Sequence, residues 1–371
     1  MGFQNAMNGA TDRAFSKREV GVPERTVPLV SVVMPSYNHE RYVGEAIESV
    51  LAQSVDDFEI IIIDDGSSDG SVNVVKKFSD TRIRLYVQNN QGAHNALNRG
   101  ATLASAPWIV ILNSDDRFHP DKLEKHLEVH ARHPNLDASV SRVRYITEGG
   151  DPVNKYGYLA VRYEQCKQVR LEHDSLFASL LVVNHLITTS CLFINREVFQ
   201  TIGGFIPLRY VHDWFMFLTL AARGRLHVIE EELTDYRRHR GNTIVEDDDR
   251  GRVEDNFVLE WQVYHAIKSE QPLITLEQAL RILCQNKRIN YRLIFLFELW
   301  RQINDNDLEK ATVIFAEQNN SLLNYALQLL RSDKGARDIF TAFKRGLGSR
   351  WWSVADYLTR AGQMVKNTVR D

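Results

Sequence analysis

The stretch Pro107-Trp108-Ile109-Val110-Ile111-Leu112-Asn113-Ser114-Asp115-Asp116 joins a short apolar run to an acidic end. Its first six residues predict a buried strand, and the acidic side chains begin where that strand ends. Burying carboxylates there costs free energy unless a cation or a ligand holds them. A hard divalent cation, which takes oxygen ligands and bridges phosphate oxygens, fits this position. The alternative is a solvated Asp-rich turn before a helix that starts at His119-Pro120, and this stretch alone leaves both open.

The residues before this stretch alternate between apolar strands and amphipathic helices. Strands are predicted at residues 29–34, 58–63, 83–87 and 107–112, and helices at 41–53, 72–78 and 93–104. Pro35 is expected to end the first strand, because it cannot donate to a ladder. The alternating order of strands and helices predicts a parallel α/β sheet.

Polar segments follow three of these strands. They are Pro35-Ser36-Tyr37-Asn38, Asp64-Asp65 and residues 113–116. Ligands of parallel α/β sheets bind beyond the carboxyl ends of the strands. We therefore expect the three segments to meet at one edge of the sheet and to form a site there.

The rest of the chain is predicted to be mixed at first and then helical. Residues 1–27 are polar and unpatterned, which predicts a disordered tail. Further strands are expected at residues 138–146 and 226–229, and helices at 176–183, 213–223 and through most of 256–363. The acidic run at residues 246–250 suggests a boundary, so we divide the chain into residues 1–27, 28–245 and 246–371.

Composition restricts the class of protein. The 371 residues are 44% hydrophobic and 25% charged, which is typical of a globular protein. A net charge of -3 gives no reason to expect nucleic-acid binding. Cys166, Cys191 and Cys284 are widely spaced, which favours a reduced compartment without structural zinc or disulfides. No window has the apolar length of a membrane span or a secretory signal, so we expect a cytoplasmic protein.

A series of short motifs follows in a fixed order along residues 28–242. They are Ser31-Val32-Val33-Met34-Pro35-Ser36-Tyr37-Asn38, Ile63-Asp64-Asp65-Gly66-Ser67-Ser68-Asp69, Asn90-Gln91-Gly92, Asn98-Arg99-Gly100, Ser114-Asp115-Asp116, Gly203-Gly204-Phe205, Asp213-Trp214, and Tyr236-Arg237-Arg238-His239 with Asn242. This series resembles the bacterial nucleotide-sugar glycosyltransferases of family 2. The resemblance implies a GT-A fold, which is a Rossmann-like, mostly parallel sheet flanked by helices, with residues 28–245 as the catalytic domain and a helical C-terminal region after it.

Family resemblance also implies an activity. Such enzymes transfer a sugar, with inversion, from a nucleoside diphosphate to a hydroxyl of a glycan or lipid-linked glycan, here in cell-surface polysaccharide biosynthesis. Asp65 would accept a hydrogen bond from the base, which suits the imide N–H of uracil and favours a UDP-sugar. The residues implied in donor binding are Pro35, Ser36, Tyr37, Asn38, Asp65, Asp115 and Asp116.

The resemblance further implies a metal cofactor, Mn²⁺ or Mg²⁺. Asp115 would be the main ligand, and His239 would be a second ligand carried by a C-terminal loop. An imidazole suits Mn²⁺ better than Mg²⁺. His239 could equally be a solvent-facing histidine. The nearby Arg237, Arg238 and Arg240 either clamp phosphates or keep the loop soluble.

Asp213 is the residue that the resemblance implies as general base. Its position at a helix start also suits an N-cap aspartate without a catalytic role. Trp214 either stacks on an acceptor sugar or belongs to the core. The chain departs from the family where His212 replaces a frequent Glu, Asn113 a frequent Asp and Leu97 a common Arg.

Three alternatives stay open. Residues 340–370 combine aromatic and basic side chains, which suits either peripheral contact with the inner-membrane surface or packing, including a contact within a homo-oligomer. A sugar nucleotidyltransferase is disfavoured because no Gly-rich phosphate loop follows the first strand. A non-catalytic sugar-nucleotide-binding protein is supported only by His212 and Asn113.

Overall fold

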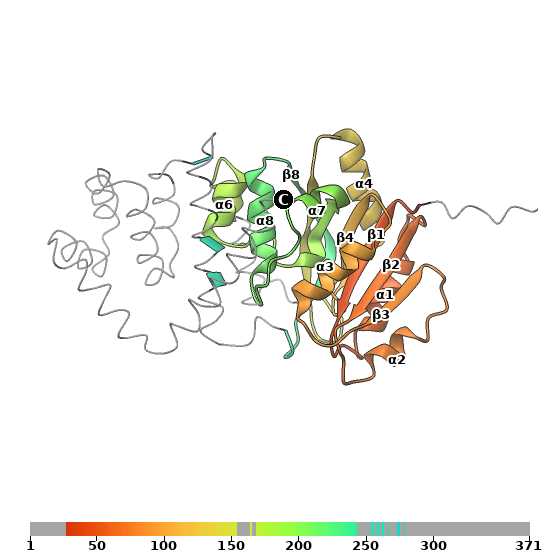
Figure 1. The fold of residues 1–371 in the computed structure, drawn as a ribbon. Helices are drawn as coiled ribbons and strands as arrows, with labels where there is room; N and C mark the ends of the chain where they lie inside the picture. Colours follow the sequence, from red (N-terminus) through yellow and green to blue (C-terminus); the bar gives the residue numbers. More distant parts are fainter. Residues whose placement is uncertain are drawn as a thin grey trace, which may run out of the picture.

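The computed structural model describes residues 27–153 and 168–242, together with residue 164 and scattered residues between 254 and 278 (Figure 1). The predictions for the tail at residues 1–27 and for residues 246–371, including the aromatic and basic segment at 340–370, lie almost entirely outside these residues. In the described part of the chain, no helix combines the length and the apolar character needed to cross a membrane.

A mixed sheet with strand order β3-β2-β1-β4-β7-β6-β8-β5 is the centre of the fold. Its strands are β1 (Val30–Ser36), β2 (Phe58–Asp64), β3 (Ile83–Val87), β4 (Trp108–Ile111), β5 (Arg117–Phe118), β6 (Ala138–Ile146), β7 (Leu192–Asn195) and β8 (Leu226–Arg237). Strands β3, β2, β1 and β4 are parallel, as are β6 and β8, whereas β7 and β5 run antiparallel to their neighbours. The predicted α/β class is confirmed.

Helices cover both faces of the sheet (Figure 1). They are α1 (Val43–Leu51), α2 (Ser71–Val75), α3 (Ala93–Leu103), α4 (Lys122–Arg132), α6 (Leu176–Val182), α7 (Arg196–Thr201) and α8 (His212–Ala222), and a 3₁₀ turn η1 spans Thr189–Cys191. Alternate strand residues serve the two cores: Val33 packs in the core that includes α3 and α8, and Val32 packs in the core that includes α1. Strands buried on both faces are continuously apolar, which is why they were visible in the sequence.

Helix α3 approaches the sheet closely because of Gly100. A Cβ added at this glycine would lie only 2.4 Å from Cγ1 of Val33 on β1. The absence of a side chain therefore allows α3 to pack directly over the strands.

Strand β1 continues one residue beyond Pro35, contrary to the prediction. Pro35 pairs in register with Ile63 of β2, and Ser36 pairs with Asp64. Leu112 N donates to Val33 O, so the backbone N–H and C=O of Val33 face β4. Backbone groups two residues apart in a strand face the same side, so those of Pro35 also face β4. Pairing with β4 ends at Val33, so the missing N–H of Pro35 costs no ladder bond.

Two further boundaries differ from the predictions. Strand β8 extends from Leu226 to Arg237 rather than ending at residue 229, because its exposed acidic middle hid the strand pattern. Register shifts against β6 occur around Arg142 in this middle part. Helix α4 begins at Lys122, after His119-Pro120, and Asp121 is its N-terminal flanking residue.

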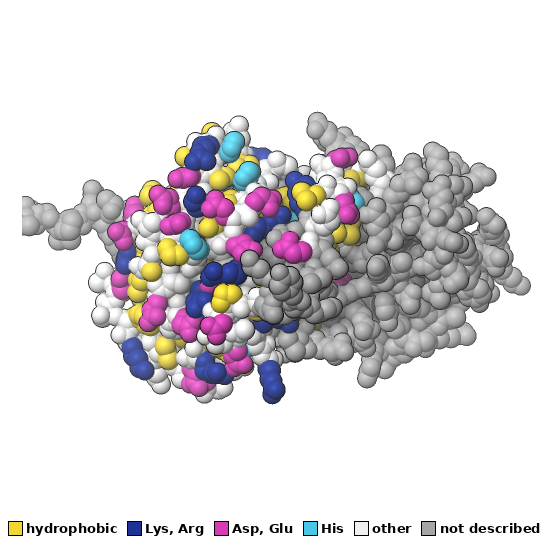
Figure 2. Space-filling model, turned by 180° about the vertical axis from the view of Figure 1, so that it is seen from behind, with side chains coloured by type: hydrophobic (Ala, Val, Ile, Leu, Met, Phe, Trp, Pro, Cys, Tyr) yellow, Lys and Arg dark blue, Asp and Glu magenta, His cyan; other side chains and the backbone are white. Residues whose placement is uncertain are grey.

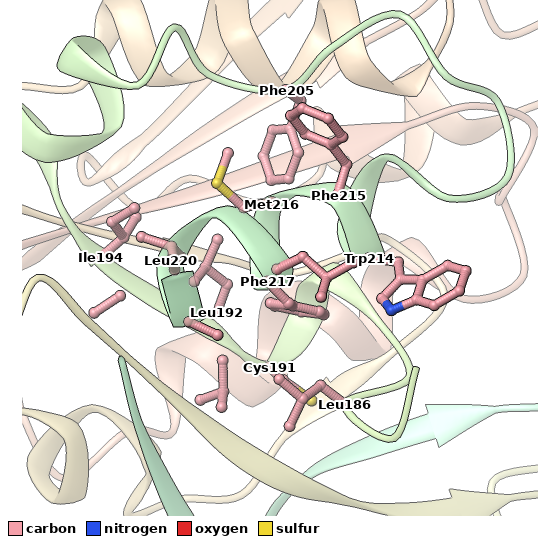
Figure 3. Close-up of a cluster of buried hydrophobic side chains, with 14 of the residues drawn as sticks. Leu186, Cys191, Leu192, Ile194, Phe205, Trp214, Phe215, Met216, Phe217 and Leu220 are labelled. Atoms are coloured by element: carbon pink, nitrogen blue, oxygen red, sulfur yellow. The ribbon is translucent and has the colours of Figure 1, made fainter. Parts of the chain in front are cut away.

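Helix α8 is apolar around most of its circumference and is buried in the core (Figure 3). Trp214 is 3% exposed, and its indole Nε1 donates to Leu180 O at 2.8 Å. Trp214 is therefore a core residue and does not stack on an acceptor sugar. In contrast to this apolar core, the molecular surface shown in Figure 2 carries acidic and basic side chains interspersed with one another.

Candidate functional site

The polar segments after β1, β2 and β4 lie at one edge of the sheet. The three strands are parallel neighbours, so their carboxyl ends point the same way. Asp65 N donates to Ser36 O at 2.8 Å, which joins the first two segments directly. The predicted convergence of polar strand ends is thus present.

Asp65 is buried and holds the loop before α3. Its Oδ1 accepts hydrogen bonds from Gln88 Nε2 (2.7 Å) and Gln91 N (2.9 Å), and its Oδ2 accepts one from Gly92 N (2.8 Å). Gly92 has φ +89°, a conformation that favours glycine. Because each carboxylate oxygen has two lone pairs, Oδ2 can still accept one hydrogen bond from a ligand.

Residues after β1 differ in their contacts. Ser36 is 3% exposed, and its Oγ is buried without a hydrogen-bond partner. Such an unpaired buried hydroxyl is costly, and a bound ligand would satisfy it. Tyr37 is 46% exposed and free to meet a ligand, whereas Asn38 Oδ1 accepts from Ser68 N at 2.8 Å and steadies the neighbouring turn.

The carboxylate of Asp115 meets two imidazoles. His239 Nε2 lies 3.0 Å from Asp115 Oδ2, and the donor atoms of His39, Asp115 and His239 all lie within 4.8 Å of one another. One carboxylate and two imidazoles form a donor set that suits Mn²⁺. We call these three residues the cation cluster. Their chemistry fits the metal that the family resemblance implies.

Supporting hydrogen bonds orient the two imidazoles. Gly241 N donates to Nδ1 of His239 at 3.2 Å, so the neutral ring carries its proton on Nε2 and donates it to Asp115 Oδ2. This proton has to leave Nε2 before Nε2 can hold a cation. His39 Nδ1 and Ser114 Oγ are 2.8 Å apart. A histidine that binds a metal through one ring nitrogen donates the N–H of the other nitrogen, and Ser114 Oγ can accept such a bond from His39.

The two adjacent carboxylates differ in electrostatics. Burial alone would raise the pKa of Asp115, but the hydrogen bond from His239 and the nearby His39 outweigh it and hold the pKa below its usual value. Burial, and then the negative charge of Asp115, raise the pKa of Asp116 well above its usual value. Asp116 accepts from Ser190 Oγ (2.6 Å) and from Arg237 N (3.0 Å), so both of its oxygens are used inside the protein.

The side chain of Arg237 is directed into the protein. It is fully buried, and its guanidinium contacts Asp115 O, Glu148 O and Glu45. These contacts use three of the five N–H donors of the guanidinium, and the burial of the side chain keeps it away from the surface. Neither of the two roles left open for Arg237, phosphate binding or keeping the loop soluble, agrees with a fully buried side chain.

Asp213 lies on a different element and does not contact the cation cluster. It is the second residue of α8, where Val211 rather than Asp213 is the N-terminal flanking residue. Its carboxylate accepts from Trp214 N (2.6 Å) and Asn184 Nδ2 (3.3 Å). Burial raises the pKa of Asp213 to about 7. A carboxyl with a pKa near neutrality can serve as a general base.

His94 connects the surroundings of Asp65 and Asp213. The charge of Asp65 acts on His94, and His94 in turn acts on His212, the neighbour of Asp213. Burial lowers the pKa of His212 to about 4, so this residue is neutral at physiological pH. His94 is therefore close enough to both Asp65 and His212 for their charges to interact.

Sequence reasoning missed His39 and Tyr42. The Tyr42 ring lies 4.7 Å from the His239 ring and 5.9 Å from the His39 ring, measured between centroids. A signal for His39 was present, because it stands three residues after Ser36 at the same sheet edge as Asp115.

Two of the family departures have a structural explanation. The Asn113 amide donates to Thr188 Oγ1 and accepts from Thr189 Oγ1, both at 3.0 Å, so it anchors the turn before Asp115. Leu97 is fully buried in the core. Neither position therefore offers a charged group to a ligand.

Comparisons with known proteins agree with the resemblance. Residues 31–203 match the family model for glycosyl transferase family 2. An uncharacterized glycosyltransferase of Rickettsia prowazekii is 32% identical over 200 residues, covering 53% of this chain and 60% of that protein. TuaG of Bacillus subtilis, named for teichuronic acid biosynthesis, is 36% identical over 132 residues, covering 35% of this chain and 52% of that protein. The chain thus spans 60% and 52% of the lengths of these two relatives.

Solved structures support the fold. S. aureus TarS 1–349 in complex with UDP-GlcNAc has a TM-score of 0.51 to this chain at 16% identity, covering 78% of this chain and 80% of that one. The same protein solved as TarS 1–349 has a TM-score of 0.50. This likeness confirms the predicted GT-A type of fold.

Proposed function

We propose that this protein is an active glycosyltransferase, since its residues 31–203 match the family model for glycosyl transferase family 2. It would move a sugar from a nucleoside diphosphate to an acceptor hydroxyl with inversion at the anomeric carbon. The observation that supports this best is the cation cluster of His39, Asp115 and His239 at the carboxyl edge of the sheet.

Donor binding would use the edge formed by β1, β2 and β4. The unpaired Oγ of Ser36 and the exposed ring of Tyr37 are available to a nucleotide. The remaining lone pair of Asp65 Oδ2 suits the imide N–H of uracil, so a UDP-sugar is the donor to test first. S. aureus TarS has been solved with such a donor, UDP-GlcNAc.

His39, Asp115 and His239 would hold Mn²⁺ or Mg²⁺, with Mn²⁺ favoured by the two imidazoles. When bound, the ion supplies positive charge that stabilises a departing diphosphate. Asp116 would not bind the ion itself, because its two oxygens already accept hydrogen bonds from Ser190 and Arg237. It would instead hold the turn that carries Asp115.

Asp213 would be the general base. Its carboxylate takes the proton of the acceptor hydroxyl while that oxygen forms a bond to the anomeric carbon of the donor sugar. The bond from this carbon to the diphosphate oxygen breaks, and the electron pair leaves with the diphosphate. Attack from the face opposite the leaving group inverts the anomeric carbon. The pKa of about 7 keeps part of the carboxyl ionised at neutral pH.

The acceptor would be a glycan or a lipid-linked glycan of a cell-surface polysaccharide. TuaG, with its name in teichuronic acid biosynthesis, is the relative that favours this assignment. A cytoplasmic location, with or without contact to the inner-membrane surface, belongs to the same proposal. A homo-oligomer is compatible with it and is tested by the mass of the protein in solution.

The test is release of UDP from a panel of UDP-sugars with Mn²⁺ and acceptor extracts, with and without a chelator. We expect release that depends on acceptor and stops with chelator. Binding of UDP-sugars without any release would favour a non-catalytic binding protein. Pyrophosphate formed from UTP and a sugar phosphate would favour a nucleotidyltransferase instead.

A further inference from the structure

We infer that Arg237 is a positioning residue of the cation cluster and sets the separation between Asp115 and His239. This inference rests on the proposed function, because it assigns a bound cation to that cluster. Arg237 is the last residue of β8, and His239 follows two residues later. Its role would be to hold the end of β8 against the acidic turn after β4.

Arg237 contacts both acidic residues of that turn. Its Nε donates to the carbonyl oxygen of Asp115 at 2.9 Å, and its backbone N–H donates to Asp116 Oδ1 at 3.0 Å. The first bond holds the main chain from which the Asp115 carboxylate projects. The second joins the main chain of β8 to the neighbouring carboxylate. Both acidic residues of the turn after β4 are thus tied to one residue of β8.

The other donors of the guanidinium point away from the cluster. Nη1 donates to Glu148 O at 2.9 Å, and Nη2 donates to Glu45 Oε2 of α1 at 2.7 Å. The guanidinium carbon lies 5.1 Å from the centroid of the Tyr42 ring, which in turn packs on His239. Only the planar fork of arginine can serve these directions at once.

Asn242 closes the arrangement from the C-terminal side. Its Nδ2 donates to Arg237 O at 3.1 Å and lies 3.4 Å from Asp115 Oδ2, while its Oδ1 accepts from His239 N at 2.6 Å. The turn that carries His239 is therefore built on the main chain of Arg237. A shift of Arg237 would move His239 relative to Asp115.

Charge and geometry can be separated at this position. Glu45 faces the guanidinium of Arg237 and also that of Arg117, so the positive charge of Arg237 is compensated outside the cluster. Arg237→Lys keeps that charge but places its donors on a single nitrogen. A weaker cation site in Arg237→Lys would therefore report lost geometry.

The experiment measures Mn²⁺ binding to the full chain by the electron paramagnetic resonance signal of free Mn²⁺, with and without UDP. We expect Arg237→Lys to bind Mn²⁺ about 10- to 100-fold more weakly than the wild type, as is typical when a residue supporting metal ligands is lost. Arg142→Lys is the matched control, because Arg142 is a buried arginine of β6 that pairs with Glu230. It should bind Mn²⁺ within about twofold of the wild type.

Equal Mn²⁺ affinity of Arg237→Lys and the wild type would overturn the inference and leave the proposed function intact. An equal loss in Arg142→Lys would also overturn it, since any buried arginine would then matter. A wild type that binds no Mn²⁺ would count against the proposed cation site itself. If Arg237→Lys does not fold, Glu45→Gln at the partly exposed end of the ion pair replaces it. We expect that variant to weaken Mn²⁺ binding several-fold, and unchanged affinity would overturn the inference.

Discussion

His239 Nε2 lies 3.0 Å from Asp115 Oδ2, although the two residues are 124 positions apart in the chain. The acidic turn after β4 supplies one partner, and the turn after β8 supplies the other. This pair connects the N-terminal half of the sheet with its C-terminal half and defines where a cation would sit.

Asp115→Asn keeps the size of the side chain but removes its negative charge. We expect Mn²⁺-dependent UDP binding to weaken by at least roughly tenfold, because a carboxylate ligand is replaced by a neutral amide. Isothermal titration with UDP, with and without Mn²⁺, measures this. Asp121→Asn, at an exposed position before α4, is the control and should leave affinity unchanged. Unaltered metal dependence in Asp115→Asn would remove Asp115 from the cation cluster.

His39→Ala tests whether the cluster has three ligands or two. If His39 supplies a ligand, Mn²⁺ affinity should fall by at least roughly tenfold while the melting temperature changes little. His119→Ala removes a half-exposed histidine that lies outside the cluster and is the control. Equal Mn²⁺ affinity of His39→Ala and the wild type would leave Asp115 and His239 as the only protein ligands of the cluster.

Asp213→Asn should bind donor normally and lose transfer. Removal of a general base costs about 100- to 10,000-fold in rate. Donor affinity and kcat are measured on the same preparation, so a binding defect is recognised. Transfer at close to the wild-type rate would exclude Asp213 as the base. In the wild type, kcat should rise with pH through about 7, because burial raises the pKa of Asp213 and only the ionised form accepts a proton.

The same raised pKa affects stability. The folded-state pKa of Asp213 is about 7 against an ordinary value of 3.8, so its neutral form contributes stability that is complete below pH 3.8 and is lost as pH rises through about 7. Asp213→Asn does not titrate. The melting temperature of Asp213→Asn minus that of the wild type should therefore be at least roughly 2 °C larger at pH 8 than at pH 5. Parallel curves for the two proteins would show that Asp213 ionises freely.

The sequence by itself determined the strands β1 to β4 and the edge at which their polar ends meet. Strands β1, β2 and β4 are mostly apolar runs, as parallel strands buried on both faces require, whereas β3 at the sheet edge alternates between apolar and polar residues. The acidic residues of Asp115-Asp116 could be placed at a strand end for the same reason. The pattern of apolar residues within a short segment depends only on the local sequence, so it predicts a strand without knowledge of the fold.

Only the tertiary structure decided the roles of Arg237, His39 and Trp214. Arginine is a residue type that often binds phosphate, but β8 places Arg237 in the interior of the protein. There its guanidinium donates hydrogen bonds to Glu45 and to the carbonyl oxygen of Asp115. His39 gained its partners because β1 and β4 are neighbours and β8 ends beside them. The side chain types alone could not show this, because a contact across 124 positions depends on strand order and register.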